Sequence, residues 1–502
     1  MDTDICIIGS GVGGGAVALT LADSGARIAI LERGERLPRE AQNTDPTAVF
    51  IDRRYRAKES WVDGTGAAFT PGQYYFVGGH TKFYGTAMFR LRERDFEATE
   101  HEDGLSPAWP LSYADLEPFY AQAEALFRVH GQAGVDPTEP PRSSAYPFGP
   151  IPHEPLIGAL ADKLRQRGLR PFHMPSAIDL REGGACVRCS TCDAFPCRLG
   201  AKGDAEVCLI DPALQRPNVS LHTGCRVTRL ITDDAGQRIV AAEFERKGEM
   251  ETIRAALFVL SAGAINSAVL LQRSATTQHP DGLANSSGAV GRFYMNHNTT
   301  GLMALMPFTV NDTRFTKTLS LNDFYAAGVG RPHALGNIQM LGNIQEPMLR
   351  SAVPSLPSWV GRPLAHHSVD WLVMSEDLPH ADSRVRLLAD GRIQLDWRRT
   401  NMATHAAFVK QTRQLLREIG FSAVLGRPFG LDVPSHQCGT VRFGNDAASA
   451  PLDPHCRTYD HPNLYVVDAS FFPSSAALNP ALTVAAQALR VGAHLKERLH
   501  SF

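Results

Sequence analysis

The chain has 502 residues, which is enough for two domains or for one large elaborated domain. Its formal net charge is −2 and no stretch is strongly basic, so we expect no nucleic-acid partner. No apolar run approaches the roughly 18 residues that are needed to cross a membrane. A strand-like run begins by residue 4 and leaves no room for a secretory signal peptide, which predicts a soluble cytoplasmic protein.

The first predicted elements form a strand–helix–strand unit over residues 4–9, 16–22 and 27–31. Three glycines occupy its first turn: Gly9, Gly11 and Gly14. In a dinucleotide-binding turn the first glycine allows the tight bend, the second lets the backbone approach a pyrophosphate, and the third lets helix pack on strand. Glu32 follows the second strand, where an acidic residue binds ribose hydroxyls and disfavours a 2′-phosphate. The unit therefore predicts a dinucleotide site.

Five sequence blocks, in this order, resemble the glucose–methanol–choline (GMC) family of FAD-dependent oxidoreductases. They are the glycine turn with Glu32, and residues 77–85, 219–264, 436–440 and 468–483. The resemblance covers most of the chain. In style the sequence is closest to the bacterial branch that oxidises pyranoses and glycosides.

The resemblance implies an α/β plus α+β fold, with a Rossmann-like FAD-binding domain and an inserted antiparallel sheet that is backed by helices. It divides the chain into a main FAD-binding part over 1–294, a substrate-binding domain over 295–430, and a C-terminal FAD-binding part over 431–502 that carries the catalytic residues. Within the inserted domain, alternating polarity predicts two strands near 383–388 and 392–397, followed by a helix over 403–420.

The resemblance also implies which residues contact FAD. They are Gly9, Gly11, Gly14, Glu32, Gly79, His80, Val227, Ala262, Asp468, Ala469, Asn479, Pro480 and Thr483. Relatives with covalently bound flavin carry a histidine where this chain has Phe83. We therefore expect non-covalent FAD, with His80 as a neighbour of the flavin or pyrophosphate.

Oxidation of an alcohol removes a hydride from carbon and a proton from oxygen, and histidine suits the second task because its pKa lies near neutrality. His436 matches the catalytic histidine of the family, and we assign it as general base. Asn479 matches the residue that pairs with it, where an amide orients the hydroxyl but cannot act as a base. Asn479-Pro480 also has the sequence of a helix start. His297 is interpreted as structural.

Four cysteines are closely spaced at Cys186, Cys189, Cys192 and Cys197, inside a Cys-rich loop over 186–208. The spacing is near that of iron–sulfur ligands, and the segment resembles a block in family members that pass electrons through such a cluster. A structural zinc ion is an alternative, as are reduced thiols. A disulfide is disfavoured in a reducing compartment.

The sequence thus predicts an FAD-dependent alcohol oxidoreductase that acts on a secondary hydroxyl of a sugar, glycoside or related polyol. Oxygen or an external electron acceptor takes the electrons, and the protein works alone, as a homo-oligomer or with a partner subunit. Two alternatives stay open. One is the same chemistry on a sterol or aliphatic alcohol, and the other is a flavin electron-transfer subunit without catalysis, which the presence of His436 and Asn479 argues against.

Overall fold

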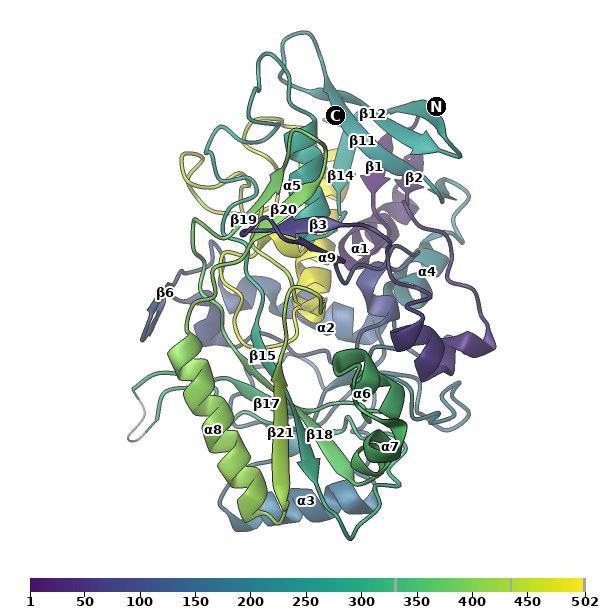
Figure 1. Ribbon diagram of the computed structural model, residues 1–502. Coiled ribbons are helices and arrows are strands. Elements are labelled where there is room, and N and C mark those ends of the chain that lie inside the picture. Colours follow the sequence, from purple (N-terminus) through teal and green to yellow (C-terminus); the bar gives the residue numbers. More distant parts are fainter. Residues whose placement is uncertain (329–331, 434–435, 500–502) are drawn as a thin grey trace.

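The computed structural model describes residues 1–328, 332–433 and 436–499. Its nucleotide-binding unit is built on a parallel five-stranded sheet in the order β10-β2-β1-β14-β22, seen in the upper half of Figure 1. The strands are β10 (Val219–His222), β2 (Ile28–Leu31), β1 (Ile5–Ile8), β14 (Leu257–Leu260) and β22 (Leu464–Val466). The three central strands are short and wholly buried, as expected of a parallel sheet that is covered on both faces. Because β22 comes from the C-terminal region, both ends of the chain build this sheet.

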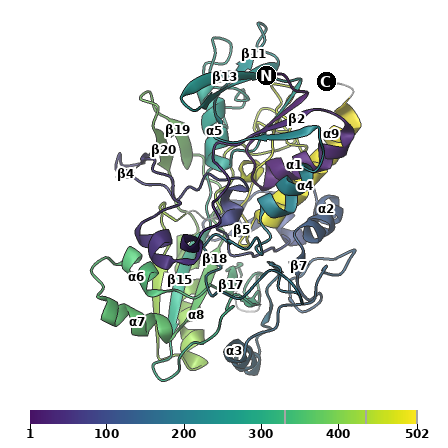
Figure 2. The ribbon, with the colours of Figure 1, turned by 90° about the vertical axis from the view of Figure 1, so that its right-hand side faces the viewer.

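Helix α1 (Val12–Leu21) follows the glycine turn and packs against the long C-terminal helix α9 (Ala481–Arg498). The two helices lie side by side in Figure 2. Their approach is close because small residues face each other: a Cβ atom at Gly492 would lie 2.7 Å from Cβ of Thr20. Helix α2 (Tyr113–Leu126) packs on α9 as well.

The second unit contains a six-stranded sheet in the order β21-β15-β18-β17-β16-β8, whose paired strands run antiparallel. The strands are β21 (Ala423–Pro428), β15 (Asn298–Leu305), β18 (Ser368–Ser375), β17 (Asn337–Met340), β16 (Leu319–Leu321) and β8 (Phe172–His173). Helices α8 (Met402–Glu418) and α3 (Pro155–Gln166) contribute to the core behind it (Figure 1).

Alternation along β15 gives this sheet two different faces. Leu302 and Ala304 join the core with the two helices, whereas Gly301 and Met303 line a cavity on the opposite face. The sheet is therefore anchored on one side and offers the other to the nucleotide-binding unit.

The predicted hairpin is present as β19 (Arg384–Leu387) and β20 (Ile393–Asp396), and the helix predicted over 403–420 is α8. The hairpin does not join the six-stranded sheet; it pairs with β3 (Trp61–Asp63) and β4 (Ala68–Phe69) in a separate sheet. The remaining strands are β5 (Thr99–His101), β6 (Gly104–Ser106), β7 (Val129–His130), β9 (Ser176–Ala177), β11 (Arg226–Thr232), β12 (Ile239–Arg246) and β13 (Glu249–Arg254). The remaining α-helices are α4 (Asp211–Ala213), α5 (Ala264–Arg273), α6 (Glu346–Ala352) and α7 (Ser358–His366).

The parallel sheet and the antiparallel sheet backed by helices confirm the predicted fold class. Within the described residues, no helix combines the length and the apolar character that crossing a membrane requires.

Candidate active site

One large cavity lies where the nucleotide-binding unit meets the open face of the six-stranded sheet. Most of the residues predicted to contact FAD line it: Gly9, Gly11, Glu32, Gly79, His80, Val227, Ala262, Asp468, Ala469, Asn479 and Pro480. Gly14 and Thr483 do not. The Gly14 backbone N–H donates to Ser261, and the Thr483 hydroxyl is bonded to Tyr120 at 2.8 Å, so both residues act in packing around the cavity.

The cavity wall suits a dinucleotide at its glycine turn. A Cβ atom at Gly11 would meet nothing within 4 Å, so only the absence of a side chain keeps this part of the cavity open. Gly79 lies directly opposite, where a Cβ atom would come within 3.2 Å of Cα of Gly11. Helix α1 begins at this point without a side-chain cap, which leaves N–H groups of its first turn for a pyrophosphate. These residues fit FAD as the bound group.

Glu32 is held at the ribose end of this site. Its carboxylate accepts hydrogen bonds from the Ser10 backbone and hydroxyl at 3.0 and 2.6 Å and from the Gly34 backbone at 2.8 Å. Burial raises the pKa of Glu32, and these hydrogen bonds oppose that shift. The carboxylate is thus fixed at the cavity wall, where its remaining lone pairs can accept ribose hydroxyls.

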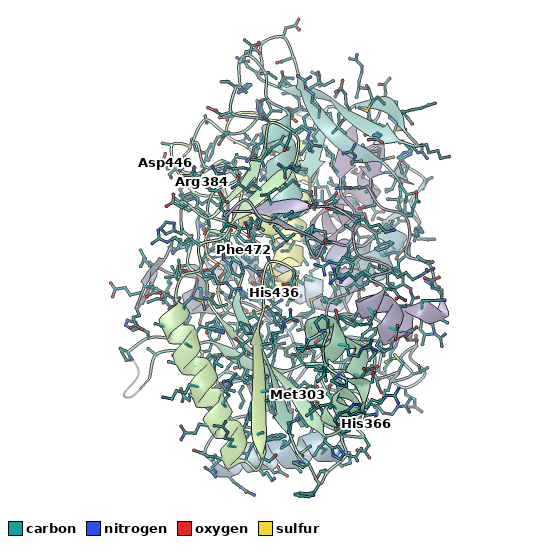
Figure 3. All side chains as sticks on the ribbon, viewed as in Figure 1. Met303, His366, Arg384, His436, Asp446 and Phe472 are labelled. Atoms are coloured by element: carbon teal, nitrogen blue, oxygen red, sulfur yellow. The ribbon has the colours of Figure 1, made fainter. Side chains whose placement is uncertain are left out.

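His436 and Asn479 meet at the centre of the molecule, below the nucleotide-binding unit; Figure 3 labels His436 there. The His436 Nε2 atom lies 3.2 Å from the Asn479 Nδ2 atom, and both residues line the cavity. Burial lowers the pKa of His436 well below its usual value, and electrostatic interactions with His297 and Lys317 lower it further. The ring is therefore unprotonated near neutral pH, and one of its nitrogens carries a lone pair.

The other nitrogen of His436 contacts a second histidine. His436 Nδ1 lies 2.8 Å from Nδ1 of His297, whose Nε2 lies 2.9 Å from the Ser475 carbonyl. Burial lowers the pKa of His297, and the Ser475 carbonyl opposes the shift. The sequence pattern marked His297 only as structural, and no local signal shows that it touches His436.

Gln339, on β17, is a further residue that sequence reasoning missed. Its Nε2 donates to Oδ1 of Asn479 at 2.9 Å, which turns the Nδ2 of Asn479 toward His436. The alternation in Asn337-Ile338-Gln339-Met340 indicates a strand with one polar face, but it does not say what that face touches.

His80 also lines this cavity, and burial lowers its pKa to about 4. His80 Nε2 lies 2.9 Å from Oε1 of Gln73, whose amide donates to Gln437 at 3.0 Å. Phe83 stacks on Tyr74 with ring centroids 3.9 Å apart, so this position offers a carbon ring with no nucleophile.

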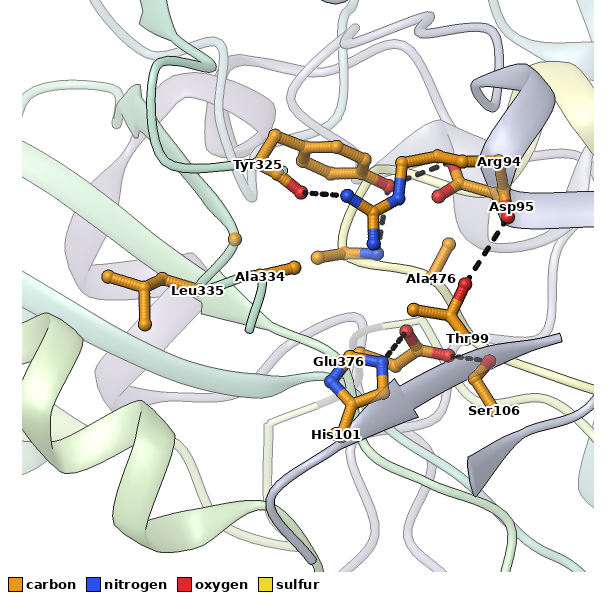
Figure 4. A pocket seen from close by; sticks show the side chains of 12 residues that line it. Arg94, Asp95, Thr99, His101, Ser106, Tyr325, Ala334, Leu335, Glu376 and Ala476 are labelled. Carbon is orange, nitrogen blue, oxygen red and sulfur yellow. Dashed lines mark hydrogen bonds and ion pairs between the residues drawn. The ribbon is translucent and has the colours of Figure 1, made fainter. Parts of the chain in front are cut away.

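A small polar cavity lies behind His297, and Figure 4 shows its side chains. There the Ser106 hydroxyl donates to Glu376 at 2.6 Å, and Nε2 of His101 lies 3.1 Å from the same carboxylate. Burial raises the pKa of Glu376 less than these contacts lower it, so the carboxylate remains ionised and its charge raises the pKa of His297. A negative charge thus stands behind the histidine pair.

The predicted metal site at Cys186, Cys189, Cys192 and Cys197 is not supported. Nowhere in the described part of the chain are three His, Cys, Asp or Glu side chains arranged to hold a metal ion. All four cysteines are free: Cys189 is exposed, and Cys186 and Cys192 pack against a small apolar cluster. Close spacing in the sequence does not by itself bring thiols into the geometry that a metal ion requires.

Comparison with protein-family models decides the family. The two parts of the GMC oxidoreductase model match residues 11–299 and 379–488. The chain belongs to the GMC oxidoreductases. Two GMC relatives cover nearly all of it: 6'''-hydroxyparomomycin C oxidase of Streptomyces lividus is 31% identical over 99% of this chain and 92% of its own length, and paromamine 6'-oxidase of Streptomyces fradiae is 32% identical over 97% and 90%.

Among solved structures, the GMC fold of this chain is similar to pyridoxine 4-oxidase from Mesorbium loti. The two share a TM-score of 0.69 and 19% sequence identity, over 98% of this chain and 99% of that one. The family assignment confirms an oxidoreductase that acts on hydroxyl groups.

Proposed function

We propose that this protein oxidises an alcohol to a carbonyl compound with non-covalent FAD, and that His436 is the general base. The observation that carries the proposal is the pair His436 and Asn479, 3.2 Å apart on a cavity that runs on to the glycine turn. FAD, when bound, supplies the acceptor for the hydride that leaves the alcohol carbon. Phe83 supports non-covalent binding, because its ring cannot form the bond that a histidine forms.

The protein's own residues handle the proton. Nε2 of His436 accepts the hydroxyl proton while the oxygen keeps the electron pair of the broken O–H bond and forms the C=O double bond. The Nδ2 of Asn479, which Gln339 orients, has a second N–H that can donate to the alcohol oxygen beside Nε2 of His436 and so hold the alcohol in position. The electrons pass finally to oxygen or to another acceptor.

For the substrate we propose a hydroxyl on a sugar, glycoside or related polyol. The support is the similarity to the two Streptomyces oxidases, which are named for paromamine and 6'''-hydroxyparomomycin C. Polar groups from both units, including Gln437 and Lys317, line the cavity with His436. They can bind additional hydroxyl groups.

A second candidate is an alcohol with an apolar body, which the wall contributed by the second unit favours. That wall carries aliphatic side chains from the open face of the sheet and from α6: Met303, Leu341, Leu372, Leu425, Met348 and Leu349. Burial of a hydrocarbon substrate against such a wall stabilises the complex by roughly 25 cal/mol per Å² of apolar surface removed from water.

The test is anaerobic reduction of the FAD-loaded protein by a panel of glycosides, aminosugars, and aliphatic and ring alcohols, followed by flavin absorbance. Bleaching by glycosides supports the first substrate class, and bleaching by apolar alcohols alone supports the second. A preparation that binds no FAD would contradict the whole proposal.

His436→Ala should slow flavin reduction by about 10²–10⁴-fold, because it removes the base without touching the glycine turn. The matched control is His366→Ala, which changes an exposed histidine on α7. Bound FAD should be equal in the two variants. Unchanged reduction in His436→Ala would refute the site assignment.

A further inference from the structure

We propose that His297 is a positioning residue that fixes His436 in one tautomer, with its proton on Nδ1 and its lone pair on Nε2. This inference rests on the proposed role of His436 as base. The tautomer matters because only a nitrogen without a proton can accept one from the substrate.

The proton arrangement starts from a main-chain group. The Ser475 carbonyl, 2.9 Å from Nε2 of His297, can only accept, so this nitrogen carries a hydrogen. His297 is 2% exposed, and its burial keeps the ring neutral. A neutral imidazole has one N–H, so Nδ1 of His297 carries a lone pair.

The second contact transmits this arrangement to His436. The two Nδ1 atoms are 2.8 Å apart, which requires that one of them donates. His297 cannot, so His436 donates from Nδ1. Because His436 is itself neutral, its Nε2 is left with the lone pair.

The opposite end of the network favours the same tautomer through the longer of the two contacts of the His436 ring. Nδ2 of Asn479 is a donor, and Nε2 of His436, at 3.2 Å, accepts from it in this tautomer. The amide cannot be turned round, because its Oδ1 accepts from Gln339 and Gln339 also donates to Asn337 at 2.9 Å. Two independent chains of hydrogen bonds, from Ser475 and from β17, thus agree on one position of the His436 proton.

This arrangement also suits the protonated state. When Nε2 gains the substrate proton, the bond from Nδ1 of His436 to His297 becomes charge-assisted and stronger. Lys317 on the cavity side opposes the positive charge on His436, whereas the ionised Glu376 favours a positive charge on the neighbouring His297. His297 therefore holds the ring in place before and after proton transfer.

The experiment compares His297→Leu with His297→Asn in the FAD-loaded protein. Leucine removes the acceptor for Nδ1 of His436, whereas the Oδ1 of asparagine can take its place. Nitrogen-15 NMR of histidine-labelled protein, with His436 assigned from the His436→Ala spectrum, reports which ring nitrogen carries the proton without any substrate.

We expect an Nδ1-protonated His436 in the wild type and in His297→Asn, and a mixture with Nε2-protonated ring in His297→Leu. Flavin reduction by the fastest alcohol of the panel should fall roughly tenfold to a hundredfold in His297→Leu and recover in His297→Asn. A purely structural role would not give this rescue.

An Nε2-protonated His436 in the wild type would overturn the inference. This measurement uses the wild-type protein alone, so it does not depend on whether a variant folds. An unchanged tautomer in His297→Leu would overturn the inference as well. Either result leaves the proposed function intact if His436→Ala slows flavin reduction as expected. Normal flavin reduction in His436→Ala would instead contradict the proposed function.

Discussion

Two glycines of one turn serve different purposes. A Cβ atom at Gly14 would lie 2.1 Å from the Gly9 carbonyl oxygen, so this glycine allows helix α1 to pack on β1. A Cβ atom at Gly11 would point into open space at the cavity. Gly14 is needed for the fold, whereas Gly11 is needed only for a ligand that comes close to the backbone.

Gly14→Ala and Gly11→Ala should therefore fail in different ways. Gly14→Ala should destabilise the ligand-free protein by about 1–3 kcal/mol, because the added methyl overpacks the turn. Gly11→Ala should unfold like the wild type but bind FAD at least about tenfold more weakly, a loss of roughly 1.4 kcal/mol. Thermal unfolding and titration with FAD measure the two effects, and a fold defect in Gly11→Ala would contradict the assignment of this surface.

At the scale of elements, a lysine holds the Cys-rich loop in place. Lys202 is wholly buried, and its ammonium donates to the carbonyls of Tyr84, Cys192 and Phe195 at 2.8, 2.8 and 2.7 Å. It thus ties the loop to the segment that carries Gly79 and His80. Asp193, which follows Cys192 in the loop, accepts a hydrogen bond from Lys317 at 2.7 Å. The loop therefore also fixes the ammonium group of Lys317 in the cavity wall.

Lys202→Met should loosen this loop, at about 1–3 kcal/mol for each buried carbonyl that loses its donor. Cys189→Ser is the control, because its thiol is exposed. Thermal unfolding of both variants, with iron and zinc content of the wild type, provides the check. Equal destabilisation by Cys189→Ser, or one metal ion per chain, would show that the thiols hold the loop.

Across the whole molecule, several histidines are buried in the neutral state. Burial lowers the pKa of His80 to about 4, of His153 to about 3 and of His405 to about 4, from 6.5. Between these values and pH 6.5 the unfolded chain binds protons that the folded protein does not. The stability that these groups contribute is complete above pH 6.5 and is lost as the pH falls toward 4.

His405 bridges three elements of the second unit, since it bonds to Thr300 of β15 at 2.9 Å and Ser375 of β18 at 3.0 Å. The wild type should lose unfolding free energy when the pH falls from 6.5 to 5. The His405→Gln variant should lose about 2 kcal/mol less over the same interval. Urea unfolding at both pH values measures this, with the exposed His366→Gln as control. The same acid sensitivity in His405→Gln and the wild type would refute the argument.

The sequence determined the local features of this protein. The apolar runs at residues 4–9 and 27–31 and the glycines between them specify the nucleotide turn, because bend, pyrophosphate approach and close packing each depend on a few adjacent residues. Motif order gave the GMC family and placed His436 and Asn479 among the candidates. The predicted metal site is not supported, because spacing along a loop does not decide whether its thiols converge.

Only the tertiary structure decided the contacts on which the proposed roles of these residues rest. His297 meets His436, and Gln339 meets Asn479, from segments 139 and 140 positions apart in the chain. Such contacts depend on how the six-stranded sheet docks against the nucleotide-binding unit, and no local pattern encodes that. The sequence thus pointed to His436 as the candidate base, whereas the packing of two units supplies the contacts from which we infer which of its nitrogens carries the lone pair.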